Sequence, residues 1–85
     1  MTRAYAVVIR RARRSYSADC PDLPGCVAAG RTVDEALRLM RAAVRMHVRG
    51  LRGAGLRVPR PATRLATLAR QRPDDQVFAF VRVAA

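Results

Sequence analysis

Residues 20–36 read CPDLPGCVAAGRTVDEA and combine a rigid turn, a short strand and a helix start. Pro21 and Pro24 lack backbone donors and have a fixed φ, so this turn cannot lie inside a strand or a helix. The apolar run 26–31 suits a strand. Thr32–Glu35 has the spacing of a capping box, which begins an α-helix. Gly25 and Gly30 allow backbone angles that other residues disfavour. The stretch therefore predicts a turn, a strand and a helix in that order.

Outward from this stretch, the sequence predicts three strands, at 4–10, 15–20 and 26–31. Short connections join them, so an antiparallel meander is the economical arrangement. A helix over 33–52 follows, with acidic residues in its first turn and arginines in its last, as the helix dipole favours. The last strand, 76–83, is apolar on both faces, which indicates a buried strand or one at a subunit interface. We predict a small α+β domain in the order β-β-β-α-β, with an antiparallel sheet covered on one face by one long helix.

Two kinds of side chain form separate stripes along this helix, at about 100° per residue. The apolar stripe, which should cover the sheet, holds Val33, Leu37, Met40, Val44, Val48 and Leu51. The arginine stripe holds Arg38, Arg41, Arg45, Arg49 and Arg52. Like charges three or four residues apart repel, so these arginines cost helix stability unless an anion compensates. Two interpretations stay open: a solvated face, or a nucleic-acid or anion-binding surface.

The segment 57–75 is irregular, because Pro59 and Pro61 prevent regular structure there. Residues 63–70 can form a short helical turn. Residues 73–75 begin a turn into the last strand.

Length and composition indicate one domain spanning residues 1–85. With 85 residues, 51% of them hydrophobic, the chain can bury a modest core. It contains no run of about 18 apolar residues and no signal-peptide layout at its start. We therefore expect a cytoplasmic protein without membrane association.

The charge balance is strongly basic. Seventeen arginines and no lysine stand against six acidic residues, which gives a net charge of +11. One interpretation is a genome bias toward arginine, scattered over a solvated surface. The other is an electrostatic footprint for RNA, DNA or an acidic partner.

The sequence predicts no metal site and no cofactor. Cys20 and Cys26 cannot supply the four ligands of a zinc site, and they suit buried structural thiols. A redox pair is the alternative, although a rigid turn separates them. His47 lies on the side of the helix opposite the arginine stripe, among apolar residues. A histidine in such a position is usually packed in the core.

The carboxylates do not predict an enzyme. A metal-dependent nuclease needs several carboxylates that converge on its ions. Asp34 and Glu35 suit a helix start, Asp22 suits a turn residue bonded to its own backbone, and residues 74–75 open the last strand. Asp19 alone remains, so a remnant nuclease is the least favoured alternative.

The ordered series of motifs resembles the HicB antitoxin family, specifically its small N-terminal domain. The matching segments are residues 5–9, residues 15–26, the G-x-T-x-x-E-A motif at 30–36, the helix exit through 55–61, and residues 77–83. The resemblance covers nearly the whole chain and implies a truncated RNase H-like fold. Many family members carry a DNA-binding domain after the closing strand, and we expect none here because the chain stops at Ala85.

The resemblance further implies an antitoxin that binds and sterically masks a small HicA-type mRNA-cleaving toxin, without catalysis. Homodimers or higher homo-oligomers are expected for such a family. We place the partner contact at the turn Pro21, Asp22, Leu23 and Pro24, and the structural motif at Gly25, Gly30, Thr32 and Glu35. The alternative is a stand-alone basic nucleic-acid-binding module on the same fold, which would use the arginine stripe for nonspecific RNA or DNA.

Overall fold

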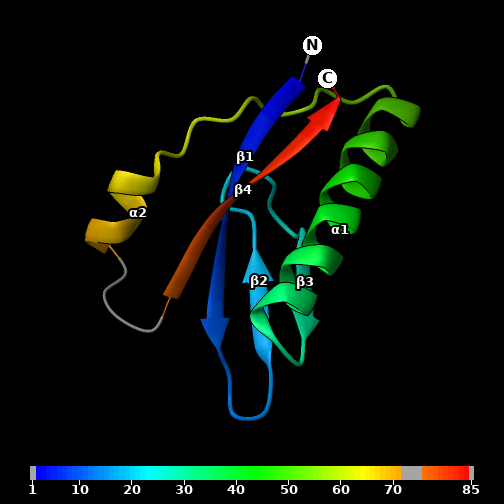
Figure 1. The fold of residues 1–85 in the computed structure, drawn as a ribbon. Helices are drawn as coiled ribbons and strands as arrows, with labels where there is room; N and C mark the ends of the chain where they lie inside the picture. The colour runs from blue at the N-terminus through cyan, green and yellow to red at the C-terminus, as the bar shows by residue number, and fades with distance from the viewer. Residues whose placement is uncertain (1, 72–75, 85) are drawn as a thin grey trace.

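A computed structural model of the chain describes residues 2–71 and 76–84, arranged as Figure 1 shows. Its elements are β1 (Thr2–Arg11), β2 (Tyr16–Asp19), β3 (Val27–Gly30), α1 (Val33–Gly53), α2 (Leu65–Gln71) and β4 (Gln76–Ala84). The predicted α+β class and the order of strands and long helix are confirmed. The helix α2 lies where a short helical turn was expected. The turn expected at 73–75 lies outside the described residues.

The four strands form one antiparallel sheet in the order β3-β2-β1-β4. The strand β1 lies inside the sheet and pairs with β2 on one side and with β4 on the other. Its residues 5–9 are buried on both faces, which explains why they form a continuous apolar run. The strand β4 is an edge strand rather than a central buried one. Its side chains Val77 and Phe80 are 42% and 49% exposed.

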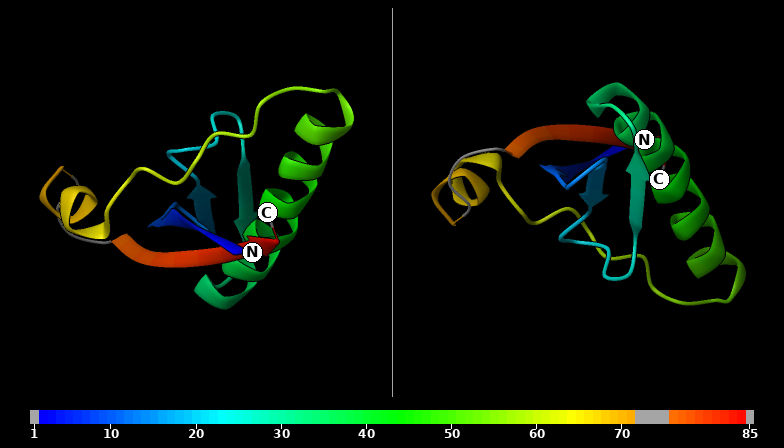
Figure 2. Two further views of the ribbon diagram at one scale, coloured as in Figure 1. Left: turned by 90° about the horizontal axis from the view of Figure 1, so that it is seen from above. Right: turned by 90° about the horizontal axis from the view of Figure 1, so that it is seen from below.

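The helices lie on opposite faces of the sheet, as the views in Figure 2 show. Successive residues of β1 point to alternate faces, so this one strand contributes to two clusters of buried residues. On the α1 face, Tyr5, Val7 and Ile9 of β1 pack with Ala36, Met40, Val44 and Val48 of α1. On the other face, Ala6 and Val8 pack with Leu68 of α2 and the partly buried Phe78 of β4. The apolar stripe of α1 therefore covers the sheet as predicted.

The start of α1 confirms the predicted cap. The Thr32 hydroxyl accepts a hydrogen bond from the Glu35 backbone N–H at 3.0 Å, which satisfies one of the unpaired donors of the first turn. The Glu35 carboxylate in turn accepts from the backbone N–H of Arg31 at 3.2 Å, one residue before the usual partner in a capping box. The helix ends before Gly55, which has a left-handed φ of +71°.

Glycine is required at position 30 because there is no room for a side chain, and not because of its backbone angles. A Cβ atom at this position would lie 2.5 Å from the backbone nitrogen of Ala36 and 2.9 Å from the carbonyl carbon of Glu35. Among the glycines described, a positive φ occurs at Gly25, with +83°, and at Gly55. The expectation about backbone angles is therefore confirmed for Gly25. At Gly30 it is wrong, because the first turn of α1 lies directly against the end of β3.

The segment between α1 and α2 returns across the sheet and is fastened to β1. The hydroxyl of Tyr5 donates to the carbonyl oxygen of Pro59, and the guanidinium of Arg3 donates to that of Val58 at 3.4 Å. Tyr5 is fully buried, so its hydroxyl needs such a partner. These bonds hold a proline-containing segment that has no regular structure of its own.

Candidate functional site

The turn between β2 and β3 is closed by three backbone hydrogen bonds. Leu23 donates to Cys20 at 3.1 Å, Cys26 donates to Leu23 at 3.0 Å, and Cys20 donates to Cys26 at 3.3 Å. The left-handed φ of Gly25 completes the reversal. The two prolines and these bonds fix the shape of the turn before any partner arrives.

The four predicted partner-binding residues of this turn have different environments. Leu23 is fully buried in the core, Pro24 is exposed, and Pro21 and Asp22 are half-buried. A binding partner can therefore reach Pro24 and Gly25 but not the side chain of Leu23. The neighbouring Val27, which was not named from the sequence, is 65% exposed at the start of β3.

Asp22 fastens the turn to the segment that precedes α2. Its Oδ2 accepts from the backbone N–H groups of Ala62 and Thr63, both at 3.0 Å, and its Oδ1 accepts from the Thr63 hydroxyl at 2.8 Å. The prediction that Asp22 bonds to its own backbone is wrong, because its carboxylate accepts from these distant donors instead. Partial burial by itself raises the pKa of Asp22, but the bonds from Thr63 and Ala62 outweigh it and lower the pKa below its ordinary value. The carboxylate is thus charged and structural at neutral pH.

Cys20 and Cys26 are free, buried thiols at the base of the same turn. Burial raises the pKa of Cys20 to about 11 and is opposed in part by hydrogen bonds from the backbone at Asp22 and Leu23. Burial also raises the pKa of Cys26. The thiolate is the reactive form, so both groups are poor nucleophiles at neutral pH, which supports a structural role.

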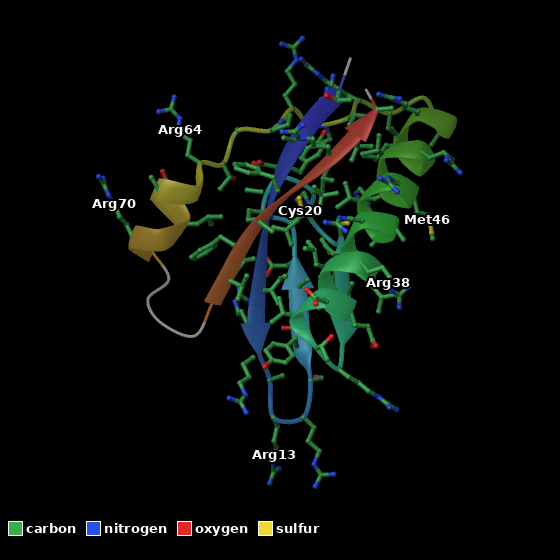
Figure 3. The ribbon with its side chains drawn as sticks, in the orientation of Figure 1. Arg13, Cys20, Arg38, Met46, Arg64 and Arg70 are labelled. Atoms are coloured by element: carbon green, nitrogen blue, oxygen red, sulfur yellow. The ribbon has the colours of Figure 1, made fainter. Side chains whose placement is uncertain are left out.

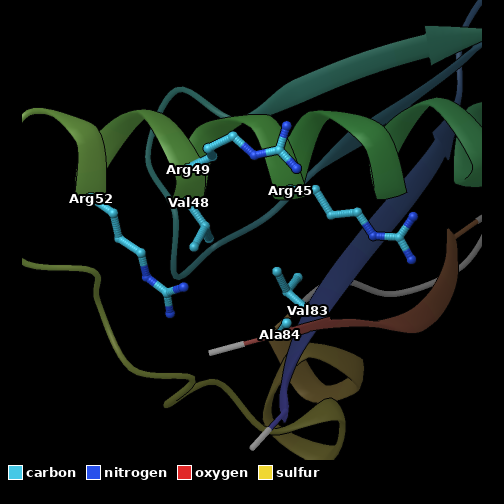
Figure 4. Close-up of a pocket in the computed structure, with 6 residues that line it drawn as sticks. All are labelled: Arg45, Val48, Arg49, Arg52, Val83 and Ala84. Atoms are coloured by element: carbon cyan, nitrogen blue, oxygen red, sulfur yellow. The ribbon is translucent and has the colours of Figure 1, made fainter.

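The predicted arginines of α1 are all exposed, and the tertiary structure brings three of them together. Arg45, Arg49 and Arg52 line a cleft of about 250 Å³ between α1 and the end of β4, which we call the arginine cleft. Val48 of α1 and Val83 and Ala84 of β4 complete its lining. In Figure 4 the side chains of Arg45 and Arg52 extend from α1 on either side of Val83. Arg38 and Arg41 continue the stripe outside the cleft.

A second arginine-rich hollow lies at the β1–β2 hairpin, where sequence reasoning placed no site. It has a volume of about 270 Å³ and is lined by Arg11, Ala12, Arg13, Arg14, Ser15, Tyr16 and Arg31. The run RRARR at residues 10–14 was the available signal. Arg31 could not be assigned to it from the sequence, because the pairing of Tyr16 with Gly30 brings it there. Figure 3 shows that arginines also project from the hairpin tip, from α1 and from the ends of α2.

The described residues contain no cluster of three or more histidine, cysteine or acidic side chains that could hold a metal ion. Asp19 lies 3.3 Å from Arg10 in an ion pair, and Asp22 is occupied by Thr63 and Ala62. His47 is half-buried on α1. Within the same residues, no helix is long and apolar enough to cross a membrane.

The fold and these surfaces define a small α+β domain whose exposed features are a rigid turn and arginine-lined hollows, as in a binding protein. The chain belongs to the HicB-like antitoxins of bacterial toxin–antitoxin systems, because the model of that family matches residues 5–85. The resemblance inferred from the motifs is thereby confirmed.

Solved structures of two antitoxin systems have the same fold. The N-terminal domain of the Burkholderia pseudomallei antitoxin HicB has a TM-score of 0.80 and 25% identity, and the match covers 96% of this chain and 99% of that domain. A HicA3–HicB3 toxin–antitoxin complex contains a chain with a TM-score of 0.70 and 20% identity, matched over 92% of this chain and 94% of that one.

Among curated proteins, an uncharacterized 14.9 kDa protein of Haemophilus phage HP1, from the rep-hol intergenic region, is 34% identical over 47 residues. That match covers 55% of this chain and 35% of the phage protein, so the chain matches about a third of that relative's length.

Proposed function

We propose that this protein binds a small HicA-type mRNA-cleaving toxin and masks it sterically, with no catalysis of its own. Membership of the HicB-like antitoxin family is the observation that carries the proposal. The similarity to a chain of a HicA3–HicB3 complex supports a partner of the HicA type. Steric masking asks only for a rigid, complementary surface.

The proposed contact is the exposed part of the β2–β3 turn together with the neighbouring edge of β3. Pro24 and Gly25 are exposed, Val27 is 65% exposed, and β3 is an edge strand of the sheet. The turn is also held rigid by Asp22, which limits the entropy that binding would cost.

The distribution of charge also favours this surface for the contact with the toxin. An RNA-cleaving toxin is expected to be basic where it holds phosphates, so a +11 protein must approach it through a surface without arginine. Residues 15–30 contain no arginine and carry Asp19 and Asp22. This segment contains β2, the turn and β3, and it includes the proposed contact.

The proposal includes a homodimer or larger homo-oligomer in the cytoplasm. The edge strand β4 supports self-association, because Val77 and Phe80 leave apolar surface exposed there. Free thiols at Cys20 and Cys26 agree with a reducing compartment.

Co-expression with a HicA-type toxin, followed by co-purification and an RNA-cleavage assay, tests this function. We expect a stable complex and loss of cleavage. Val27→Arg should weaken the complex by at least about tenfold, since it places a charge at a desolvated contact. Met46→Arg is the matched control, because Met46 is a 72% exposed apolar residue on α1. Absence of a complex, or cleavage that continues in its presence, would contradict the proposal.

A further inference from the structure

The arginine cleft concentrates positive charge that the fold itself does not compensate. Arg45, Arg49 and Arg52 follow one another at intervals of four and three residues, so they are neighbours on the surface of α1 and repel one another. In residues 2–71 and 76–84, the cleft arginines make no hydrogen bond or ion pair. Each guanidinium therefore presents its donors to solvent.

Apolar side chains form the floor of the cleft. Val48 and Val83 are 4% and 7% exposed and form an apolar floor between the side chains of Arg45 and Arg52 (Figure 4). The end of β4 closes the side that would otherwise be open solvent (Figure 4). An anion placed above this floor meets donors from more than one arginine, and the low-dielectric floor strengthens that attraction.

The arginine stripe continues along α1 beyond the cleft, and its regular spacing limits the kinds of anion that can compensate it. A rise of about 1.5 Å per residue separates successive arginines by roughly 4.5–6 Å, and Arg41 and Arg38 continue the series beyond the cleft. A single carboxylate or a free phosphate would compensate one position and leave the others in repulsion. A ligand that carries negative charge at regular intervals compensates the whole series.

A nucleic-acid backbone fits better than an acidic protein segment. Guanidinium groups bind phosphate oxygens through paired hydrogen bonds, and they also stack on bases, which an acidic peptide lacks. The net charge of +11 is distributed over several surfaces, including the hairpin hollow and the ends of α2 (Figure 3). A long polyanion gains from that wider field, whereas a short acidic segment uses one patch of it.

We infer that the arginine cleft binds consecutive phosphate groups of a single-stranded nucleic acid, with Arg45, Arg49 and Arg52 as the contacting residues. The cleft is too small for a duplex to enter, so single strands bind more tightly than the corresponding duplex. Sequence preference is weak, because phosphate contacts carry no base information. This inference concerns the protein without a toxin and does not rest on the proposed antitoxin function.

The dependence of the binding constant on salt concentration gives the inference a measurable magnitude. Each phosphate contact with a single strand contributes about −0.7 to the slope of log K against log salt concentration. The double variant Arg45→Gln/Arg49→Gln removes two contacts, so the slope should become shallower by about 1.4. The same relation predicts an affinity loss of roughly 25-fold at about 0.1 M salt. These side chains are exposed and repel each other, so the variant should remain folded.

The experiment measures binding by fluorescence anisotropy, with a labelled 20-nucleotide single strand as RNA and as DNA. The measurement is repeated with duplex DNA and with polyglutamate. The control variant Arg64→Gln/Arg70→Gln removes the same charge beside α2, away from the cleft. Arg45→Lys/Arg49→Lys keeps the charge and removes the paired donors. Circular dichroism establishes that each variant is folded.

We expect single strands to bind, the cleft variant to show the shallower slope, and the control to lose less than about threefold in affinity. The lysine variant should keep most of the slope and lose affinity. No binding of single strands at 50 mM salt would overturn the inference. Equal losses in the cleft and control variants, or polyglutamate binding as tight as RNA, would overturn it as well.

Discussion

Replacing Asp22 with asparagine should loosen the β2–β3 turn from the segment before α2. The carboxylate accepts three hydrogen bonds from Ala62 and Thr63. Hydrogen bonds to charged groups contribute about 1.5–3 kcal/mol when buried, and the partial exposure of this site reduces each to roughly 1 kcal/mol. Asparagine keeps one acceptor oxygen for the two backbone N–H groups and places its amide against the Thr63 hydroxyl, so the bonds lose the strength that the carboxylate charge gives them. The variant should therefore lose about 2 kcal/mol of unfolding free energy.

In a domain of this size, that loss corresponds to a fall in Tm of roughly 8–16 °C. Urea unfolding at pH 7 measures the free energy directly, and trypsin should cleave more rapidly after Arg57 and Arg64 in the variant. Asp34→Asn is the matched control. It removes an exposed carboxylate from the first turn of α1 and should cost only about 0.3–1 kcal/mol through the helix dipole.

The pH dependence provides a second check on Asp22. Because its pKa is lower in the folded protein, its contribution is fully present above the unfolded value of about 3.9 and is lost as the pH falls through the folded pKa. The difference between wild type and Asp22→Asn should therefore be complete at pH 7 and shrink below about pH 4. Equal unfolding free energies at pH 7 would refute the reasoning, as would a difference that stays constant down to pH 3.

Gly30→Ala should destabilise the domain by about 1–3 kcal/mol or more, because the new Cβ meets the backbone of Ala36. Gly50→Ala should stabilise it by about 0.5–1 kcal/mol, since no atom lies within 4 Å of a Cβ there and alanine favours a helix more than glycine does. Urea denaturation of both variants tests the opposite signs, and two shifts of the same sign would contradict the argument. Thr32→Ala should cost about 0.5–2 kcal/mol through loss of the helix cap, and Thr32→Ser should restore most of it. Cys20, with its pKa raised to about 11, should react with iodoacetamide at pH 8 far more slowly in the folded protein than in urea, and equal rates would show that the thiol is accessible.

Elements that depend on neighbouring residues were predictable from the sequence. The cap at Thr32 and the left-handed Gly25 follow from contacts within a few residues. The apolar stripe of α1 follows from the helical period, and the strands follow from short β-branched runs beside turns. The family could be identified for the same reason, because its motifs are an ordered series of such local features.

Features that join distant segments were not predictable. Asp22 was assigned to its own turn, yet its partners lie 40 and 41 residues away. The two apolar faces of β4 indicate a buried strand or one at a subunit interface, and the structure shows an edge strand whose two faces meet different helices. The hairpin hollow needs Arg31, which only the pairing of β2 with β3 brings to residues 11–16.

The sequence by itself determined the local elements, the two stripes of α1 and the excess of positive charge. The tertiary structure alone decided that three of the arginines line a cleft with the end of β4, that the turn is tied to Thr63, and that Gly30 has no room for a side chain. The physical reason is that propensity, capping and periodicity act over a few residues. Clefts, distant hydrogen bonds and close backbone contacts arise only where packing brings remote segments together.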